Sequence, residues 1–196
     1  MIKFNTNSPL NENKSSINIT YPRNVDIIFG NYSYPDVINN FIIQIKNNLN
    51  PDLKNFTNVK GEMTSWDFFT KKPEFVNFIT YLINKYQTSH PDIFQYFLER
   101  KDIQNAWGNQ IKKGDRLSFH KHPSFHGILY LTEGCDLILP ELNLQISPKP
   151  GDYYIFPPEI LHGFDVYQED NIRYSLIFNI VQRFNSFDFD NKLTTV

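Results

Sequence analysis

The stretch RLSFHKHPSFHGILYLT, residues 116–132, contains three of the five histidines of this chain. Alternate side chains of a β-strand point to the same face, so His120 and His122 are expected to share one face. That spacing presents two imidazoles to one metal ion. His126 has the same parity, although Pro123 is expected to break the strand before it.

A second stretch, GDYYIFPPEILH, contributes another histidine. A glycine turn at Gly151, an apolar strand and a proline-bounded bend place His162 at the start of a following strand. Imidazole clusters without thiols suit iron, zinc, copper or nickel. We therefore predict His120, His122 and His162 as metal ligands, with His126 as a further candidate.

Short segments with a period near two fill the chain from about residue 105 onward, and glycine, proline and Asn-Asp turns separate them. So many short strands predict an antiparallel barrel or sandwich. The expected strands are 106–111, 116–121, 127–132, 136–139, 142–146, 152–156, 163–167 and 173–181.

The first half of the chain is expected to support this β-rich core. A strand is predicted at 24–29 and a helix at 35–48. A second helix is expected to start near residues 72–73, and a third helix is expected at 91–98. Residues 1–16 are expected to form a loose polar arm. We predict one domain over 1–196, made of an arm and supporting helices (1–104), a metal-binding β-barrel core (105–183) and a tail (184–196).

Composition excludes several classes of function. The net charge of -2 gives no electrostatic case for nucleic acid. The single cysteine, Cys135, excludes an internal disulfide and suits a reducing compartment. With no secretory signal and no apolar run of about 20 residues, the expectation is a soluble, cytoplasmic protein without membrane partners. Whether it forms a homodimer is left open by the sequence.

A buried arginine is expected near the end of the predicted core. Arg173 and Ser175 share one face of a strand that is otherwise apolar. An arginine inside a barrel is costly unless it pairs with an anion. A dicarboxylate is a suitable partner because a guanidinium group binds a carboxylate through two parallel hydrogen bonds.

These segments together resemble the 2-oxoglutarate/Fe(II)-dependent dioxygenase superfamily. More narrowly, they are similar to the group of such oxygenases found in bacteria and marine bacteriophages, which has a prolyl 4-hydroxylase-like core. Residues 57–66 also resemble a segment of the phage group. The matching motifs are Trp107-Gly108-Asn109, Gly114-Asp115, His120-Lys121-His122-Pro123, residues 127–131, Gly151-Asp152 with Phe156-Pro157, His162, Arg173-Tyr174-Ser175 and Phe178-Asn179.

The resemblance implies a double-stranded β-helix, that is, a jelly-roll or cupin-like barrel, mainly β with flanking N-terminal helices. It implies Fe(II) held by His120 and His162, and 2-oxoglutarate as cosubstrate with O₂. Arg173, Ser175 and Tyr130 would bind its distal carboxylate. The implied reaction couples oxidative decarboxylation of 2-oxoglutarate to hydroxylation of an unidentified substrate, a protein side chain or a small molecule. A phage origin would place the protein in the host cytoplasm.

One position departs from the superfamily pattern. His122 stands where the superfamily has an aspartate or glutamate, and three neutral imidazoles leave an iron site more positive than usual. Asp115, the nearest upstream carboxylate, is expected in a turn. Two alternatives therefore stay open: a cupin-type metal enzyme, with His126 where cupins usually have glutamate, and a non-catalytic barrel that binds a ligand.

Overall fold

The computed structural model describes residues 2–4, 16–21, 23–55, 58–91, 103–134, 136–158 and 160–180. The regular structure of the described residues is mainly β, in two sheets, with two α-helices. The helices are α1 (Pro35–Asn47) and α2 (Pro73–Tyr86). The strands are β1 (Ile2–Phe4), β2 (Ser16–Tyr21), β3 (Arg23–Asn31), β4 (Val59–Lys60), β5 (Glu62–Met63), β6 (Ile103–Ile111), β7 (Arg116–His120), β8 (Phe125–Tyr130), β9 (Leu137–Leu139), β10 (Leu144–Ile146), β11 (Asp152–Phe156), β12 (His162–Phe164) and β13 (Arg173–Ile180).

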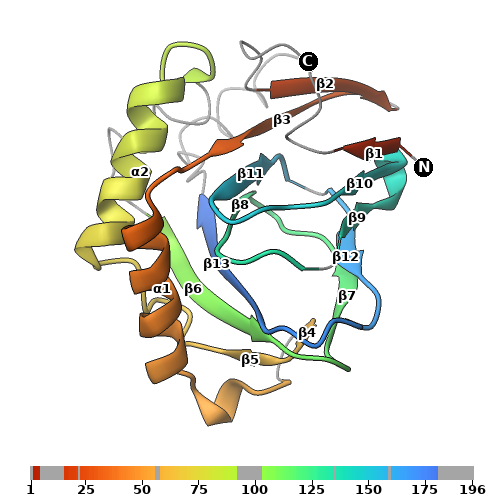
Figure 1. Ribbon diagram of the computed structural model, residues 1–196. Helices are drawn as coiled ribbons and strands as arrows, with labels where there is room; N and C mark the ends of the chain where they lie inside the picture. The colour runs from red at the N-terminus through yellow and green to blue at the C-terminus, as the bar shows by residue number, and fades with distance from the viewer. Residues whose placement is uncertain are drawn as a thin grey trace, which may run out of the picture.

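Strands that follow one another in sequence mostly belong to different sheets (Figure 1). A six-stranded sheet has the order β1-β10-β9-β12-β7-β4, and a seven-stranded sheet has the order β2-β3-β11-β8-β13-β6-β5. Neighbouring strands are antiparallel, except that β1 pairs with β10 in parallel. From β6 to β13, the chain passes between the sheets after nearly every strand.

Both helices cover the outer face of the seven-stranded sheet (Figure 1). Each begins with a proline, whose fixed φ suits the first turn of a helix. In α1 the buried side chains recur at helical spacing, as Ile38, Phe41 and Ile45. The corresponding stripe of α2 consists of Phe75, Phe78, Ile79, Leu82 and Tyr86.

The side chains of β13 alternate between two environments. Leu176 and Phe178 belong to the core beneath the helices, whereas Ile177 belongs to the core between the two sheets. Arg173 and Ser175 have the same parity as Ile177, and both are buried. The predicted alternation of this strand is therefore observed, and it directs two polar side chains to the space between the sheets.

The expected elements correspond closely to the observed ones, with some differences in extent. Ile2–Phe4 pairs with β10 instead of lying in a loose arm. The strand expected at 163–167 begins at His162 and ends at Phe164. The expected third helix and tail, and Cys135, lie outside the described residues. Neither described helix is long and apolar enough to cross a membrane.

Candidate metal centre

The first pair of histidines is formed by two neighbouring strands. His162, the first residue of β12, lies directly opposite His120, the last residue of β7. Between this pair and the next pair, Phe164 with Leu117, the register shifts by one residue. This bulge inserts an extra residue in β7, so Leu117 and His120 face the same side despite their odd separation.

Gly163 allows the bulge to form. A Cβ atom at this position would lie 2.8 Å from the carbonyl oxygen of Leu117 and 3.0 Å from Cα of Phe119. Both of these are backbone atoms, which cannot move aside as a flexible side chain can. The close approach of β12 to β7, and with it the direction of His120, therefore requires glycine at residue 163.

His122 reaches the cluster from a loop. The expectation that a continuous strand aligns His120 and His122 is wrong, because β7 ends at His120 and residues 121–124 connect it to β8. Pro123 has no N–H to donate to a neighbouring strand, which explains the break. The two imidazoles still meet, with their Nε2 atoms 3.0 Å apart.

The three predicted ligands do converge. The side chains of His120, His122 and His162 each offer a nitrogen atom, and these atoms lie within 4.8 Å of one another. Two nitrogens bound at right angles to one ion at about 2.1 Å are about 3 Å apart, as the Nε2 atoms of His120 and His122 are. No carboxylate of the described residues joins this group. Asp115 lies in the turn before β7, where its carboxylate accepts a hydrogen bond from Lys112 N.

Backbone carbonyls orient two of the imidazoles. Nδ1 of His120 lies 2.9 Å from the carbonyl oxygen of Ser118, and Nδ1 of His162 lies 2.9 Å from that of Ile160. A carbonyl oxygen only accepts, so Nδ1 carries the proton in both rings and Nε2 keeps its lone pair. This is the tautomer that a metal ligand with Nε2 as donor requires.

Burial keeps the cluster uncharged. It lowers the pKa of His120, and together with the neighbouring His162 and His120 it lowers the pKa of His122 to about 3. Burial and His120 also lower the pKa of His162 to about 4. The imidazoles are therefore neutral near pH 7, and no proton has to be displaced before a metal binds.

His126, the fourth histidine of this region, packs behind the other three. Its ring lies parallel to that of His122, with centres 3.9 Å apart and planes inclined by 14°. The ring centre of His162 is 5.0 Å away. His126 is only 4% exposed, and its Nδ1 lies 3.0 Å from Oδ1 of Asn179, its cross-strand neighbour in β13. Strand parity identified His126. Asn179 belongs to the matching motif Phe178-Asn179, but its contact with His126 was not predicted from the sequence.

Glu141 connects the two loops that carry histidines. Its carboxylate lies 2.8 Å from Nζ of Lys121, between His120 and His122, and accepts a longer hydrogen bond (3.4 Å) from the backbone N–H of Leu161. The ion pair is half-exposed, so its energetic contribution is small. Sequence reasoning did not single out Glu141, which is distant in sequence from both loops.

A narrow cavity lies between the sheets, on the side of β13 that bears Arg173. Arg173 and Ser175 both line it, and so does Asn109, which pairs with Ser175 in the β6–β13 register. Oδ1 of Asn109 is buried and has no hydrogen-bond partner among the described residues. The cavity measures about 20 Å³, space for about one water molecule. The remaining walls are apolar: Val59, Ile111, Leu117, Ile128, Leu137, Phe164 and Ile177.

Aromatic rings hold the guanidinium of Arg173. Its Cζ atom lies 4.7 Å from the ring centre of Phe164 and 4.9 Å from that of Tyr130. Such contacts stabilise a buried cation through the negative faces of the rings. Tyr130 was expected to contribute its hydroxyl to a carboxylate, but it meets Arg173 through its ring and is not among the residues that line the cavity.

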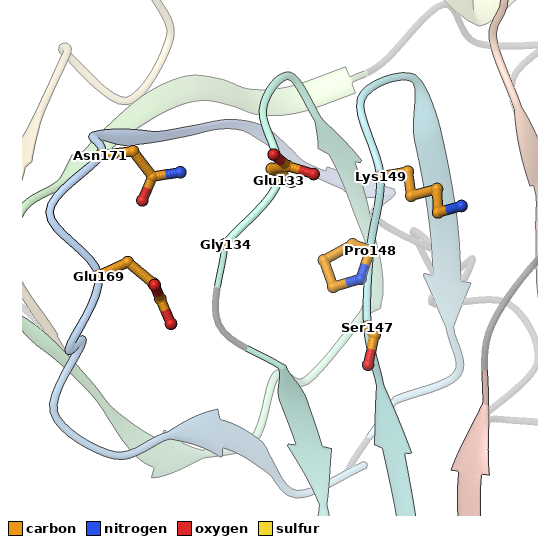
Figure 2. Close-up of a pocket in the computed structure, with 7 residues that line it drawn as sticks. All are labelled: Glu133, Gly134, Ser147, Pro148, Lys149, Glu169 and Asn171. Atoms are coloured by element: carbon orange, nitrogen blue, oxygen red, sulfur yellow. The ribbon is translucent and has the colours of Figure 1, made fainter.

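A larger pocket lies at the end of the sheets away from the histidines. In the β8–β13 pair, His126 and Asn179 mark the histidine end, whereas Tyr130 and Ser175 mark the opposite end. There, residues of three loops line an open pocket, as Figure 2 shows. Its volume is about 310 Å³. Its lining is mainly polar and contains no histidine: Glu133, Gly134, Ser147, Pro148, Lys149, Glu169 and Asn171.

The solved structures named below are similar to this chain at low sequence identity. No protein-family model and no curated protein matches it. A viral collagen prolyl hydroxylase from Paramecium Bursaria Chlorella virus-1, in its 2OG complex, superposes with a TM-score of 0.59 and 13% identity over 78% of this chain and 94% of that chain. For a Pseudomonas putida prolyl-4-hydroxylase the TM-score is 0.57, with 13% identity over 80% and 92%.

HygX from Streptomyces hygroscopicus, with nickel and 2-oxoglutarate bound, gives a TM-score of 0.54 and 10% identity, covering 78% of this chain and 81% of that chain. Each of these matches spans most of both proteins. The chain therefore has the fold of these prolyl hydroxylases and of HygX. At such low identity the likeness is one of fold, and the chemistry has to be argued from the side chains.

Proposed function

We propose that this protein is a 2-oxoglutarate- and iron(II)-dependent oxygenase that hydroxylates a protein side chain or a small molecule. The observation that carries the proposal is the combination of two features between the same two sheets. Three neutral imidazoles converge at one end, and a buried arginine lines a small, mainly apolar cavity between the same sheets. One is suited to a metal ion and the other to a dicarboxylate.

The strand order supports a double-stranded β-helix, or jelly roll, as the scaffold of this site. The strands β11-β8-β13-β6 in one sheet and β10-β9-β12-β7 in the other would be the two interleaved halves of such a fold. We propose that residues 1–196 form one domain, with 105–183 as its core. In support, β2 to β5 from the N-terminal part pair with strands of that core or with each other.

The donor set fits a divalent transition metal. His120, His122 and His162 would hold the ion through nitrogen atoms, and for His120 and His162 the carbonyl contacts assign Nε2 as the donor. Three facial protein ligands leave positions open for a chelating oxo-acid and for O₂, as in non-haem iron oxygenases. Iron(II) bound there would supply the activation of O₂.

The cavity residues fit the cosubstrate. Arg173 would pair with the distal carboxylate of 2-oxoglutarate, and Ser175 would donate a hydroxyl hydrogen bond to it. Asn109 also lines the cavity, and its side-chain NH2 group could donate a hydrogen bond to the same carboxylate. The cavity must widen from about 20 Å³ to admit a dicarboxylate, so binding is expected to move its lining side chains.

The remaining residues around the cavity would control access of water. The ring of Phe164 and the aliphatic side chains of Leu117, Ile128 and Ile177 form an apolar wall. Excluding water protects a reactive oxidant and strengthens the pairing of Arg173 with an anion. The overall reaction would place one oxygen atom of O₂ in the hydroxylated product and the other in succinate, with release of CO₂. We place this reaction in the cytoplasm, in a host cell if the gene is of phage origin.

A cupin-type metal enzyme is the second candidate. One observation favours it: the described ligand set contains only imidazoles, whereas the oxygenase pattern has a carboxylate where His122 stands. Such an enzyme would bind a metal at the same histidines but would not consume 2-oxoglutarate. A non-catalytic, ligand-binding barrel would bind no metal and would not consume 2-oxoglutarate.

Succinate formation tests the proposal. The iron-loaded protein is incubated with 2-oxoglutarate under air, and succinate is quantified with H162A as the matched control. We expect uncoupled succinate production by the wild type and none by H162A. A protein that binds iron but neither binds nor consumes 2-oxoglutarate would be the cupin-type enzyme instead.

A further inference from the structure

The three candidate ligands are not held in the same way. His120 and His162 each donate Nδ1–H to the carbonyl oxygen two residues earlier in the chain, those of Ser118 and Ile160. Both rings also belong to strands. His122 lies in the loop before β8, and among the described residues its Nδ1 has no such carbonyl contact.

The surface against which His122 rests is the ring of His126. The two rings are nearly parallel, at 14°, with centres 3.9 Å apart. That separation corresponds to direct van der Waals contact between ring faces. The stack continues to His162, whose ring is inclined by 15° to His122 and by 26° to His126.

His126 is itself held rigidly. It belongs to β8, is 4% exposed and lies opposite Asn179 in β13. Its Nδ1 donates to Oδ1 of Asn179 at 3.0 Å. The orientation of the ring is thereby determined by two central strands of the seven-stranded sheet, while the loop that bears His122 lies outside any strand.

We propose that His126 is a positioning residue that orients the loop histidine His122 toward the metal by ring stacking. This inference rests on the proposed metal site and deepens it. His126 would take the place that a backbone carbonyl occupies for His120 and His162. Because the contact is between ring faces, the flat aromatic ring of His126 would be what matters. The nitrogen atoms of His126 would not be metal ligands in this arrangement.

A matched pair of substitutions separates stacking from packing. H126F keeps a flat ring against His122, whereas H126L keeps an apolar side chain of similar size without a flat face. Each purified protein is titrated with Co²⁺, and both the dissociation constant and the visible absorption of bound Co²⁺ are recorded. H122A serves as the reference for a site that lacks this ligand, and H90F is the control for replacing a histidine elsewhere. Thermal unfolding without metal establishes that each variant is folded.

We expect H126F to bind Co²⁺ within a few-fold of the wild-type affinity and with the wild-type spectrum. H126L should lose about 10–100-fold in affinity, the range for removing an orienting partner of a metal ligand, and its spectrum should approach that of H122A. Wild-type affinity and spectrum in H126L would overturn the inference. So would an equal loss in H126F and H126L, because then the nitrogen atoms of His126 are needed. If the wild type binds no Co²⁺, the proposed metal site itself fails.

Discussion

His162 lies directly opposite His120 across the antiparallel strands β12 and β7, and their ring centres are 4.4 Å apart. The bulge in β7 beside this pair is what turns His120 toward the space between the sheets. Two residues far apart in sequence thus become one side of the candidate metal centre. Their alignment depends on the backbone, and it can be tested without changing either histidine.

Gly163→Ala tests this dependence. The added methyl group would meet the carbonyl oxygen of Leu117 at 2.8 Å, which forces β12 away from β7. We expect a destabilisation of about 1–3 kcal/mol, as for other overpacked sites, and weaker Co²⁺ binding. Thermal unfolding and Co²⁺ titration measure the two effects. Removing the nearby side chain in G163A/F119A should not restore either, because the closest contact is with the backbone; restoration would contradict this account of the bulge.

Arg173→Ala tests the proposed cosubstrate site. A desolvated, charge-assisted hydrogen-bonded pair is worth roughly 1.5–3 kcal/mol, so the apparent KM for 2-oxoglutarate should rise by well over tenfold. R173K should restore only part of the apparent affinity for 2-oxoglutarate, because an ammonium group cannot form the bidentate hydrogen bonds of a guanidinium. The measurement is succinate formation against the concentration of 2-oxoglutarate. The matched control is R116A, at an exposed arginine. An unchanged KM in R173A would show that the cosubstrate binds elsewhere.

Much of this architecture was predictable because it depends on local patterns. Strand alternation placed Arg173 and Ser175 on one face of β13, and the observed burial of both agrees with it. The proline-bounded bend predicted His162 at the start of a strand, where it lies. Helical spacing of apolar residues predicted α1 to within one residue at its end.

Other features depend on contacts between distant segments, and no local pattern reports those. The bulge at His120 arises from the close approach of Gly163, and the position of His122 comes from a loop rather than a strand. The ring of His126 stacks on His122 and also contacts Asn179, which is 53 residues away in sequence. Tyr130 was correctly placed near Arg173, but the geometry of the contact, ring against guanidinium, was not foreseeable.

The metal-free protein should lose stability in mild acid. In the folded state the pKa is about 3 for His122 and about 4 for His162, whereas unfolded histidines titrate near 6.5. Between pH 6.5 and about 4, unfolding therefore takes up protons, and the free energy of unfolding falls as the pH falls. The upper limit is about 1.4 kcal/mol per pH unit for each group.

Thermal unfolding between pH 7 and pH 5 in the presence of a chelator measures this dependence. The range stays above the titration of most carboxylates. H162Q should show a shallower pH dependence than the wild type, and H90Q should keep the wild-type slope. Equal unfolding temperatures at pH 5 and pH 7 would mean that the histidine cluster can accept protons without unfolding.

His122→Asp tests whether the third imidazole is compatible with the proposed chemistry. A carboxylate at residue 122 would return the negative charge that the superfamily pattern supplies, so it should attract a divalent ion more strongly than a neutral side chain does. We expect H122D to retain iron and Co²⁺, and to retain or increase uncoupled succinate formation. H122A should bind metal more weakly, and H162A should form no succinate, because each removes a ligand without replacing it. Metal titration and the succinate assay on the three variants show whether a carboxylate can replace the imidazole at residue 122. Loss of metal in H122D as complete as in H122A would show that the loop delivers a ligand only when its side chain is an imidazole stacked on His126.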